Sequence, residues 1–123
     1  GMNDDSDTDV NTPNTQWLNY FNAVADICDV LGIEFVPVTI PNVPSKYHGG
    51  KSKHVRDSGY RYIDFAEVVD NGINSNWKDG MLSPDNIHPN KKGAAVLSQE
   101  ALAKVPEFLS PPVQILRSVI TLS

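Results

Sequence analysis

The chain has 123 residues, 40% of them hydrophobic and 20% charged, which is enough for one domain with its own core. The net charge of −5 and the lack of a basic run argue against a nucleic-acid surface. No apolar run approaches the length of a membrane span, and the single cysteine, Cys28, excludes an internal disulfide.

The N-terminal residues 1–14 are acidic and polar, and they predict a loop. No signal peptide opens the sequence, so we expect a mature, intracellular or trimmed polypeptide. Gly1 is either native or a remnant of a tag, and the sequence leaves both options open.

The first helix is predicted over residues 15–31, where apolar residues recur at helical spacing. Asn14 or Thr15 is suited to cap its start, and Gly32 is suited to end it. Trp17 and Phe21 are expected in the core. Cys28 lies on the same stripe, so we expect a small buried hydrophobe rather than a nucleophile.

Two strands are predicted after this helix, at residues 33–40 and 60–65, because both segments are rich in β-branched or aromatic residues. Pro37 does not suit ordinary strand pairing, since it has no N–H to donate. Between them, residues 45–59 are basic and polar and predict a solvated face with a short helix closed by Gly59. His48 and His54 match no zinc spacing.

The sequence after residue 69 predicts a long loop, a helix and a tail. The loop at residues 70–88 is long for a compact domain, which is typical of functional loops, and Trp77 is expected to anchor it together with Leu82. A helix is predicted over residues 90–105, stopped by Pro106. Residues 110–123 are too apolar for a solvated tail and are expected to form an extra strand or to pack on a partner chain.

The loop contains the candidate for chemistry. Asp85 and His88 are three residues apart in a turn-forming stretch, and Pro89 favours an extended His88 at the start of the last helix. A carboxylate at this spacing is able to reach an imidazole nitrogen, fix its tautomer and stabilise the imidazolium. The simpler interpretation is a solvated turn or a helix cap, which is the commoner role of a lone Asp-x-x-His.

The surrounding residues favour the catalytic interpretation. The run Asp85-Asn86-Ile87-His88-Pro89-Asn90, preceded by Trp77 to Leu82 and followed by Gly93-Ala94, resembles the C-terminal motif of the SGNH (GDSL) hydrolases. Gly1-Met2-Asn3-Asp4 is similar to the Gly-x-Asn-Asp motif of the same family. The resemblance covers residues 1–109 and implies an α/β fold: a partial three-layer αβα, flavodoxin-like domain with a parallel sheet, whose N-terminal strands are missing.

The resemblance also implies a function, that of a serine ester hydrolase acting on acyl or acetyl esters, among them carbohydrate esters. His88 would be the general base, Asp85 would orient it, and the Asn3 side chain would donate to the oxyanion. No metal or organic cofactor is implied. Localisation is left open, with a secreted or periplasmic parent protein as one option.

The nucleophile of that family is the serine of a Gly-Asp-Ser motif, which the sequence lacks. Because an incomplete parallel sheet leaves an open edge, we expect a homodimer or a complementing N-terminal segment. Ser83 or Ser110 offers a different serine across such an interface. The alternative is a catalytically inactive, truncated or interaction protein that oligomerises through its incomplete sheet.

Overall fold

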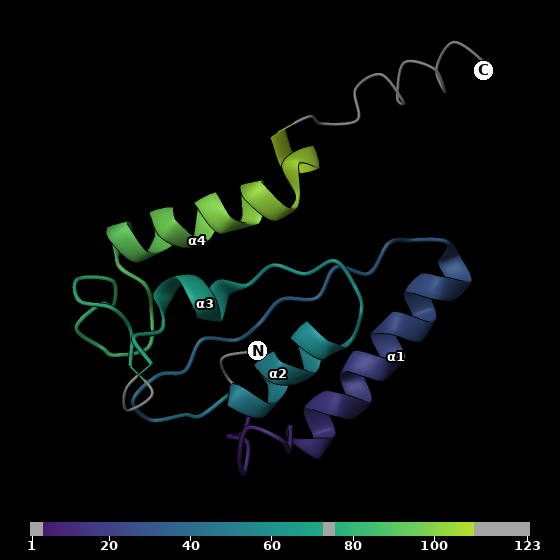
Figure 1. The fold of residues 1–123 in the computed structure, drawn as a ribbon, viewed down its shortest axis with the longest axis horizontal. Helices are drawn as coiled ribbons and strands as arrows, with labels where there is room; N and C mark the ends of the chain where they lie inside the picture. The colour runs from purple at the N-terminus through teal and green to yellow at the C-terminus, as the bar shows by residue number, and fades with distance from the viewer. Residues whose placement is uncertain (1–3, 73–75, 110–123) are drawn as a thin grey trace.

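The structure is a computed structural model that describes residues 4–72 and 76–109. The described chain forms four α-helices and a final 3₁₀ helix (Figure 1): α1 (Thr15–Leu31), α2 (Gly49–Asp57), α3 (Phe65–Val69), α4 (Lys91–Lys104) and η1 (Pro106–Leu109). The predicted boundary between a unit at residues 1–109 and a tail at 110–123 stays a prediction, since the tail lies outside the described residues.

The longest helix, α1, has the predicted boundaries. The Asn14 side chain accepts a hydrogen bond from the Trp17 N–H at 3.1 Å and caps its start. Gly32 ends it with φ of 69°, the left-handed conformation that glycine adopts without a steric penalty. Phe21 is buried as expected, whereas Cys28 is only partly buried.

The predicted parallel α/β sheet is wrong, because the described residues contain no β-strand. Residues 33–40 and 60–65 run side by side but meet at one parallel bridge, between Val38 and Ile63. Two hydrogen bonds hold this bridge, from the Thr39 N–H to the Ile63 carbonyl at 3.0 Å and from the Ile63 N–H to the Pro37 carbonyl at 3.1 Å. A strand needs a repeated ladder of such bonds, and two segments without further neighbours are marginal in water.

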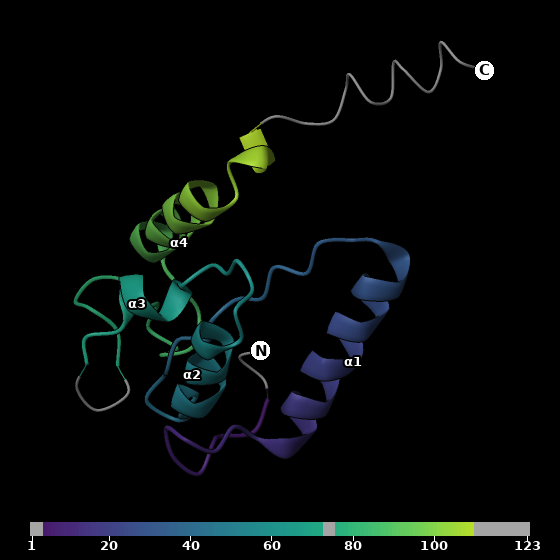
Figure 2. The same ribbon diagram turned by 45° about the vertical axis from the view of Figure 1, so that its right-hand side comes forward.

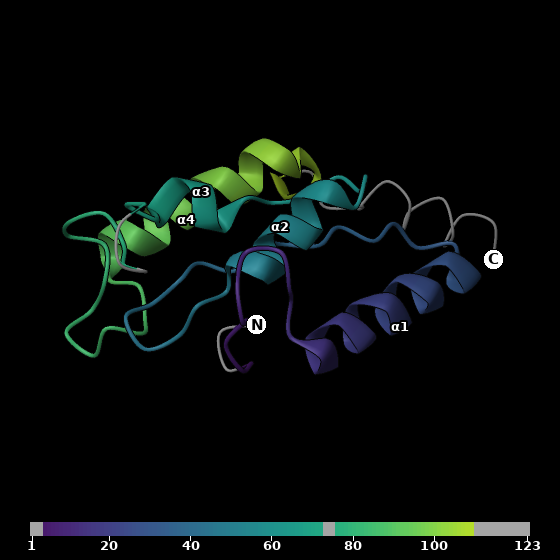
Figure 3. The same ribbon diagram turned by 60° about the horizontal axis from the view of Figure 1, so that its bottom comes forward.

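The extended segment at residues 33–41 nevertheless runs through the middle of the molecule. Figures 2 and 3 show α1 on one side of this segment and α3 with α4 on the other. The buried apolar residues come from the two extended segments, α2, α3 and the loops after residue 41 and before α4: Ile40, Val43, Val55, Ile63, Ala66, Val69, Trp77 and Met81. The core therefore lies between the helices and two extended segments, without a sheet.

Two of the helices after the extended segment, α3 and α4, begin at a capping side chain. The Asp64 side chain accepts from the Glu67 N–H and caps α3. The Asn90 side chain accepts from the Gly93 N–H at 3.0 Å and caps α4. Trp77 is buried and its indole N–H donates to the Asn42 carbonyl at 2.7 Å, so it anchors the long loop as predicted.

Candidate active site at the Asp85–His88 loop

The candidate site lies in the loop that leads into α4. The Ser83 N–H donates to the His88 carbonyl at 2.8 Å, and the Asn86 N–H donates to the Ser83 carbonyl at 3.0 Å. Asn86 has φ of 61°, a left-handed conformation that asparagine tolerates better than most residues. The loop therefore closes on itself and fixes the backbone of His88.

The structure brings Asp85 and His88 together, as the sequence predicts. Asp85 Oδ2 lies 2.6 Å from His88 Nδ1, and Asp85 Oδ1 accepts the backbone N–H groups of Ile87 and His88, each at 2.9 Å. The pKa of Asp85 falls to about 2, first through the backbone N–H of His88, then through its ring and through the N–H of Ile87. The carboxylate is therefore ionised at neutral pH.

An ionised carboxylate only accepts hydrogen bonds, so the 2.6 Å contact places a proton on His88 Nδ1. In the neutral imidazole the other ring nitrogen, Nε2, is then the free base. Nε2 has no hydrogen-bond partner among the described residues, and the His88 side chain is 74% exposed against 47% for Asp85. The pair is able to take a proton from a hydroxyl that approaches from solvent.

The start of α4 holds both ends of this loop. The Asn90 side chain donates to the Gly80 carbonyl at 2.8 Å and to the Leu82 carbonyl at 3.3 Å. The Asn90 N–H donates to the Met81 carbonyl at 3.0 Å. Gly93, in the first turn of α4, packs so closely that a Cβ atom there would overlap the same Met81 carbonyl.

Overpacking usually costs about 1 to 3 kcal/mol, and an overlap with a backbone carbonyl favours the upper end of that range. Alanine regains about 1 kcal/mol in helix propensity, so Gly93→Ala is expected to lower the free energy of unfolding by about 2 kcal/mol. Urea unfolding measures it. Ser98→Ala, at an exposed position of the same helix, is the control and should lose nothing. A Gly93→Ala protein as stable as the unaltered chain would contradict the close packing.

A nucleophile does not lie beside His88 in the described chain. The Ser83 hydroxyl donates to the Pro89 carbonyl at 3.1 Å, so it is tied to the loop backbone rather than to the imidazole. Ser110 and the predicted oxyanion residue Asn3 lie outside the described residues. Of the predicted site, the structure therefore assembles Asp85 and His88 alone.

A second polar cluster was missed, because residues 45–59 were predicted to be a solvated face. His48 and Lys51 are both fully buried. Lys51 Nζ lies 2.8 Å from Asp7 Oδ1, 2.5 Å from the Asp5 carbonyl and 3.1 Å from His48 Nδ1. The carboxylate comes from the N-terminal loop, and Asp7 lies 44 positions before Lys51 in the sequence, so composition alone does not reveal the pairing.

Close packing allows this burial. A Cβ atom on Gly50 would overlap the backbone of Asp9 and Thr12, so the small residue lets the N-terminal loop lie against α2. Burial lowers the pKa of His48 to about 4, and the positive charge of Lys51 adds a smaller effect in the same direction. Gly49-Gly50 directly before Lys51 is the signal in the sequence that indicates such a close approach.

The described ranges contain no group of three or more His, Cys, Asp or Glu side chains that is arranged to hold a metal ion. They also contain no helix long and apolar enough to cross a membrane. No protein-family model, no curated protein and no solved structure matches this chain.

Proposed function

We propose that this chain supplies the acid–base pair of a serine ester hydrolase of the SGNH type. The observation that carries the proposal is the 2.6 Å contact between Asp85 Oδ2 and His88 Nδ1, in a loop that leaves Nε2 open to solvent. This is the arrangement in which a carboxylate orients a general base for attack by a hydroxyl.

In the proposed reaction, His88 Nε2 takes the proton of a serine hydroxyl as its oxygen attacks the ester carbonyl. The imidazolium then gives that proton to the departing alcohol, and an acyl-serine remains. Water repeats the two steps and releases the acid. Asp85 keeps its charge throughout and stabilises the imidazolium. Asn3 would donate to the oxyanion. The substrates are acyl or acetyl esters, with carbohydrate esters among them.

The nucleophile has to be a serine other than Ser83, because the sequence has no Gly-Asp-Ser motif and the Ser83 hydroxyl is tied to Pro89. We propose a homodimer in which Ser110 comes from the second copy, or a complementing segment that carries the serine. The alternative function is a catalytically inactive interaction protein, which the missing motif favours. The mass of the full chain from light scattering tests the dimer.

Hydrolysis of p-nitrophenyl acetate by the full chain tests the activity. His88→Ala is expected to lower the rate about 10²- to 10⁴-fold, the usual contribution of a general base. Asp85→Asn should also lower it, while Asp79→Asn, at an exposed position of the same loop, should not. Because the pKa of Asp85 is about 2, protonation of this carboxylate should not affect the activity above pH 4.

Labelling with a fluorophosphonate, followed by mass spectrometry, identifies the serine that acts with His88. Labelling that is lost in His88→Ala supports the hydrolase. Equal rates for the unaltered and His88→Ala chains, with no labelled serine, would overturn a hydrolase formed by this chain or its homodimer and favour the interaction protein.

A further inference from the structure

The extended segment at residues 34–41 has one unpaired backbone edge. Backbone groups alternate along an extended chain, and those of Pro37 and Thr39 face Ile63, with which they form the single bridge. The peptide groups of Val36 and Val38 then face the other way, and neither residue has a backbone hydrogen bond within the described residues. A row of free N–H and C=O groups readily pairs with another extended chain.

The edge ends where α2 meets it. The Ser52 hydroxyl accepts from the Ile40 N–H and donates to the Ile40 carbonyl, both at 3.0 Å. This side chain satisfies the next outward-facing peptide groups along the segment. The free edge is therefore short and defined: it comprises Val36 and Val38, and it stops at Ile40.

Two apolar grooves flank this edge, one on each side. The first, of about 260 Å³, lies between α1 and the segment and is lined by Trp17 and Phe21 among others. The second, of about 210 Å³, lies toward α4 and is lined by Phe65 and Leu97 among others. Val38 lines both grooves, and the residue is 37% exposed. A strand paired with the edge would place its alternate side chains into the two grooves.

The C-terminal tail has the composition of such a strand. Residues 113–122 read Val-Gln-Ile-Leu-Arg-Ser-Val-Ile-Thr-Leu, rich in the β-branched residues that strands favour. Six of the ten are large and apolar, so their alternation gives both faces apolar side chains. Phe108 and Leu109, directly before the tail, are already exposed and apolar.

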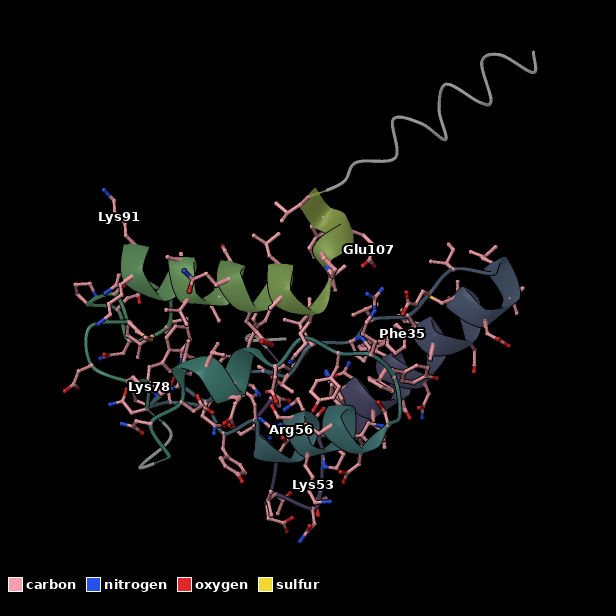
Figure 4. All side chains as sticks on the ribbon, turned by 45° about the horizontal axis from the view of Figure 1, so that its top comes forward. Phe35, Lys53, Arg56, Lys78, Lys91 and Glu107 are labelled. Atoms are coloured by element: carbon pink, nitrogen blue, oxygen red, sulfur yellow. The ribbon has the colours of Figure 1, made fainter. Side chains whose placement is uncertain are left out.

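The tail starts near the beginning of the segment. Arg61 pairs with Glu34 at 2.6 Å and with Glu107 at 2.7 Å, so η1 is held beside Glu34, on the side where residues 60–65 lie. The tail therefore has to pass the beginning of the segment to reach the free edge. Figure 4 shows Glu107 and Phe35 on neighbouring parts of the molecule. Residues 110–113 span about 13 Å when extended, and they serve as the connection from η1 to the free edge, so that pairing with Val36 and Val38 begins after them.

We propose that residues 113–122 pair as a strand with the free edge at Val36 and Val38 of the same chain and fill both apolar grooves. The pairing satisfies the free peptide groups and covers apolar surface that water otherwise contacts. It does not depend on the proposed hydrolase activity, since it uses neither Asp85 nor His88.

Hydrogen exchange of the full chain, followed by mass spectrometry, tests the proposal. Amides of residues 113–122 and of Val38 are expected to exchange at least about 10-fold more slowly than those of an unstructured peptide. Val38→Lys should remove the protection of the tail, because it puts a charge between the two grooves. Val30→Lys makes the same change at a site that is 84% exposed and lines neither groove, and it should leave the protection unchanged.

A second variant avoids any change to the folded part. Val119→Pro removes an N–H from the tail and breaks its pairing, so protection at Val36 and Val38 should fall. Unprotected tail amides in the unaltered chain would overturn the proposal. Protection that disappears on dilution, together with a dimeric mass, would assign the grooves to the tail of a second copy and overturn pairing within one chain.

Discussion

Replacing Lys51 with methionine is expected to lower the free energy of unfolding by about 3 to 5 kcal/mol, the usual cost of breaking a buried ion pair from one side. Methionine fills a similar volume but leaves the Asp7 carboxylate buried without its cation. Both side chains are fully buried, with Lys51 Nζ 2.8 Å from Asp7 Oδ1. Urea unfolding followed by circular dichroism measures the loss.

The matched control lies two residues away on the same helix. Lys53 pairs with Asp57 at 2.6 Å, but its side chain is 48% exposed and lies on the outer side of α2 (Figure 4). Lys53→Met should change the stability by less than about 1 kcal/mol, as exposed pairs do. If both variants lost equal amounts, the burial of the Lys51–Asp7 pair would not be the cause.

The double variant Asp7→Asn with Lys51→Met separates the ion pair from its hydrogen bonds. The Asp7 carboxylate also accepts the backbone N–H groups of Asn14, at 2.6 Å, and of Lys51, at 2.8 Å. An asparagine keeps one acceptor oxygen and carries no charge. The double variant should therefore regain part of the stability that Lys51→Met alone loses.

The slope of the free energy of unfolding against pH should have opposite signs in a variant that lacks His48 and in one that lacks Asp70. His48 is buried, and its pKa falls from the ordinary 6.5 to about 4, through burial and then through the charge of Lys51. Between these values the unfolded chain binds a proton that the folded chain does not. His48 therefore lowers the free energy of unfolding as the pH falls from 6.5 to 4, by at most about 3 kcal/mol.

Asp70 acts in the opposite direction. Burial raises its pKa from 3.8 to about 7, and its Oδ1 is buried without a hydrogen-bond partner. Between these values the folded chain holds a proton that the unfolded chain has released. Asp70 therefore lowers the free energy of unfolding as the pH rises from 3.8 to 7, by at most about 4 kcal/mol.

Between pH 4 and 6.5 the titrations of His48 and Asp70 change the free energy of unfolding in opposite directions, so they largely offset each other in the unaltered chain. Replacing one of the two residues leaves the effect of the other. Asp70→Asn should gain stability as the pH rises through this window, whereas His48→Gln should lose it. Thermal unfolding at a series of pH values measures both slopes. Parallel slopes in the two variants would contradict the opposed titrations.

Local signals in the sequence were sufficient for α1 and α4, whereas α2 begins and ends at other residues than predicted. Asn14, Asp64 and Asn90 each cap a helix as their chemistry indicates, and Gly32 ends α1 in the left-handed conformation. These are interactions between residues a few positions apart, which is why they are readable from the order of residues. The contact between Asp85 and His88 belongs to the same class, because three residues and a turn suffice to form it.

Local signals did not predict that residues 33–40 and 60–65 form no sheet, nor that His48 and Lys51 are buried. Residues 33–40 and 60–65 have the composition of strands, yet the number of hydrogen bonds they form depends on which segments lie beside them. Pro37 has no N–H, Ser52 satisfies Ile40, and the two segments form one bridge with each other. Strand propensity describes how a side chain fits a sheet and does not supply the neighbouring strand.

The sequence by itself determined where α1 begins and ends, the bounds of α4 to within one residue, and that Asp85 reaches His88, because these depend on local spacing. The tertiary structure alone decided that Lys51 and His48 are buried. A lysine is buried only where a distant partner neutralises it, and Asp7 reaches it because Gly50 allows the N-terminal loop to approach. Because Asp7 lies 44 positions before Lys51, local spacing does not reveal that this basic, polar segment is part of the interior.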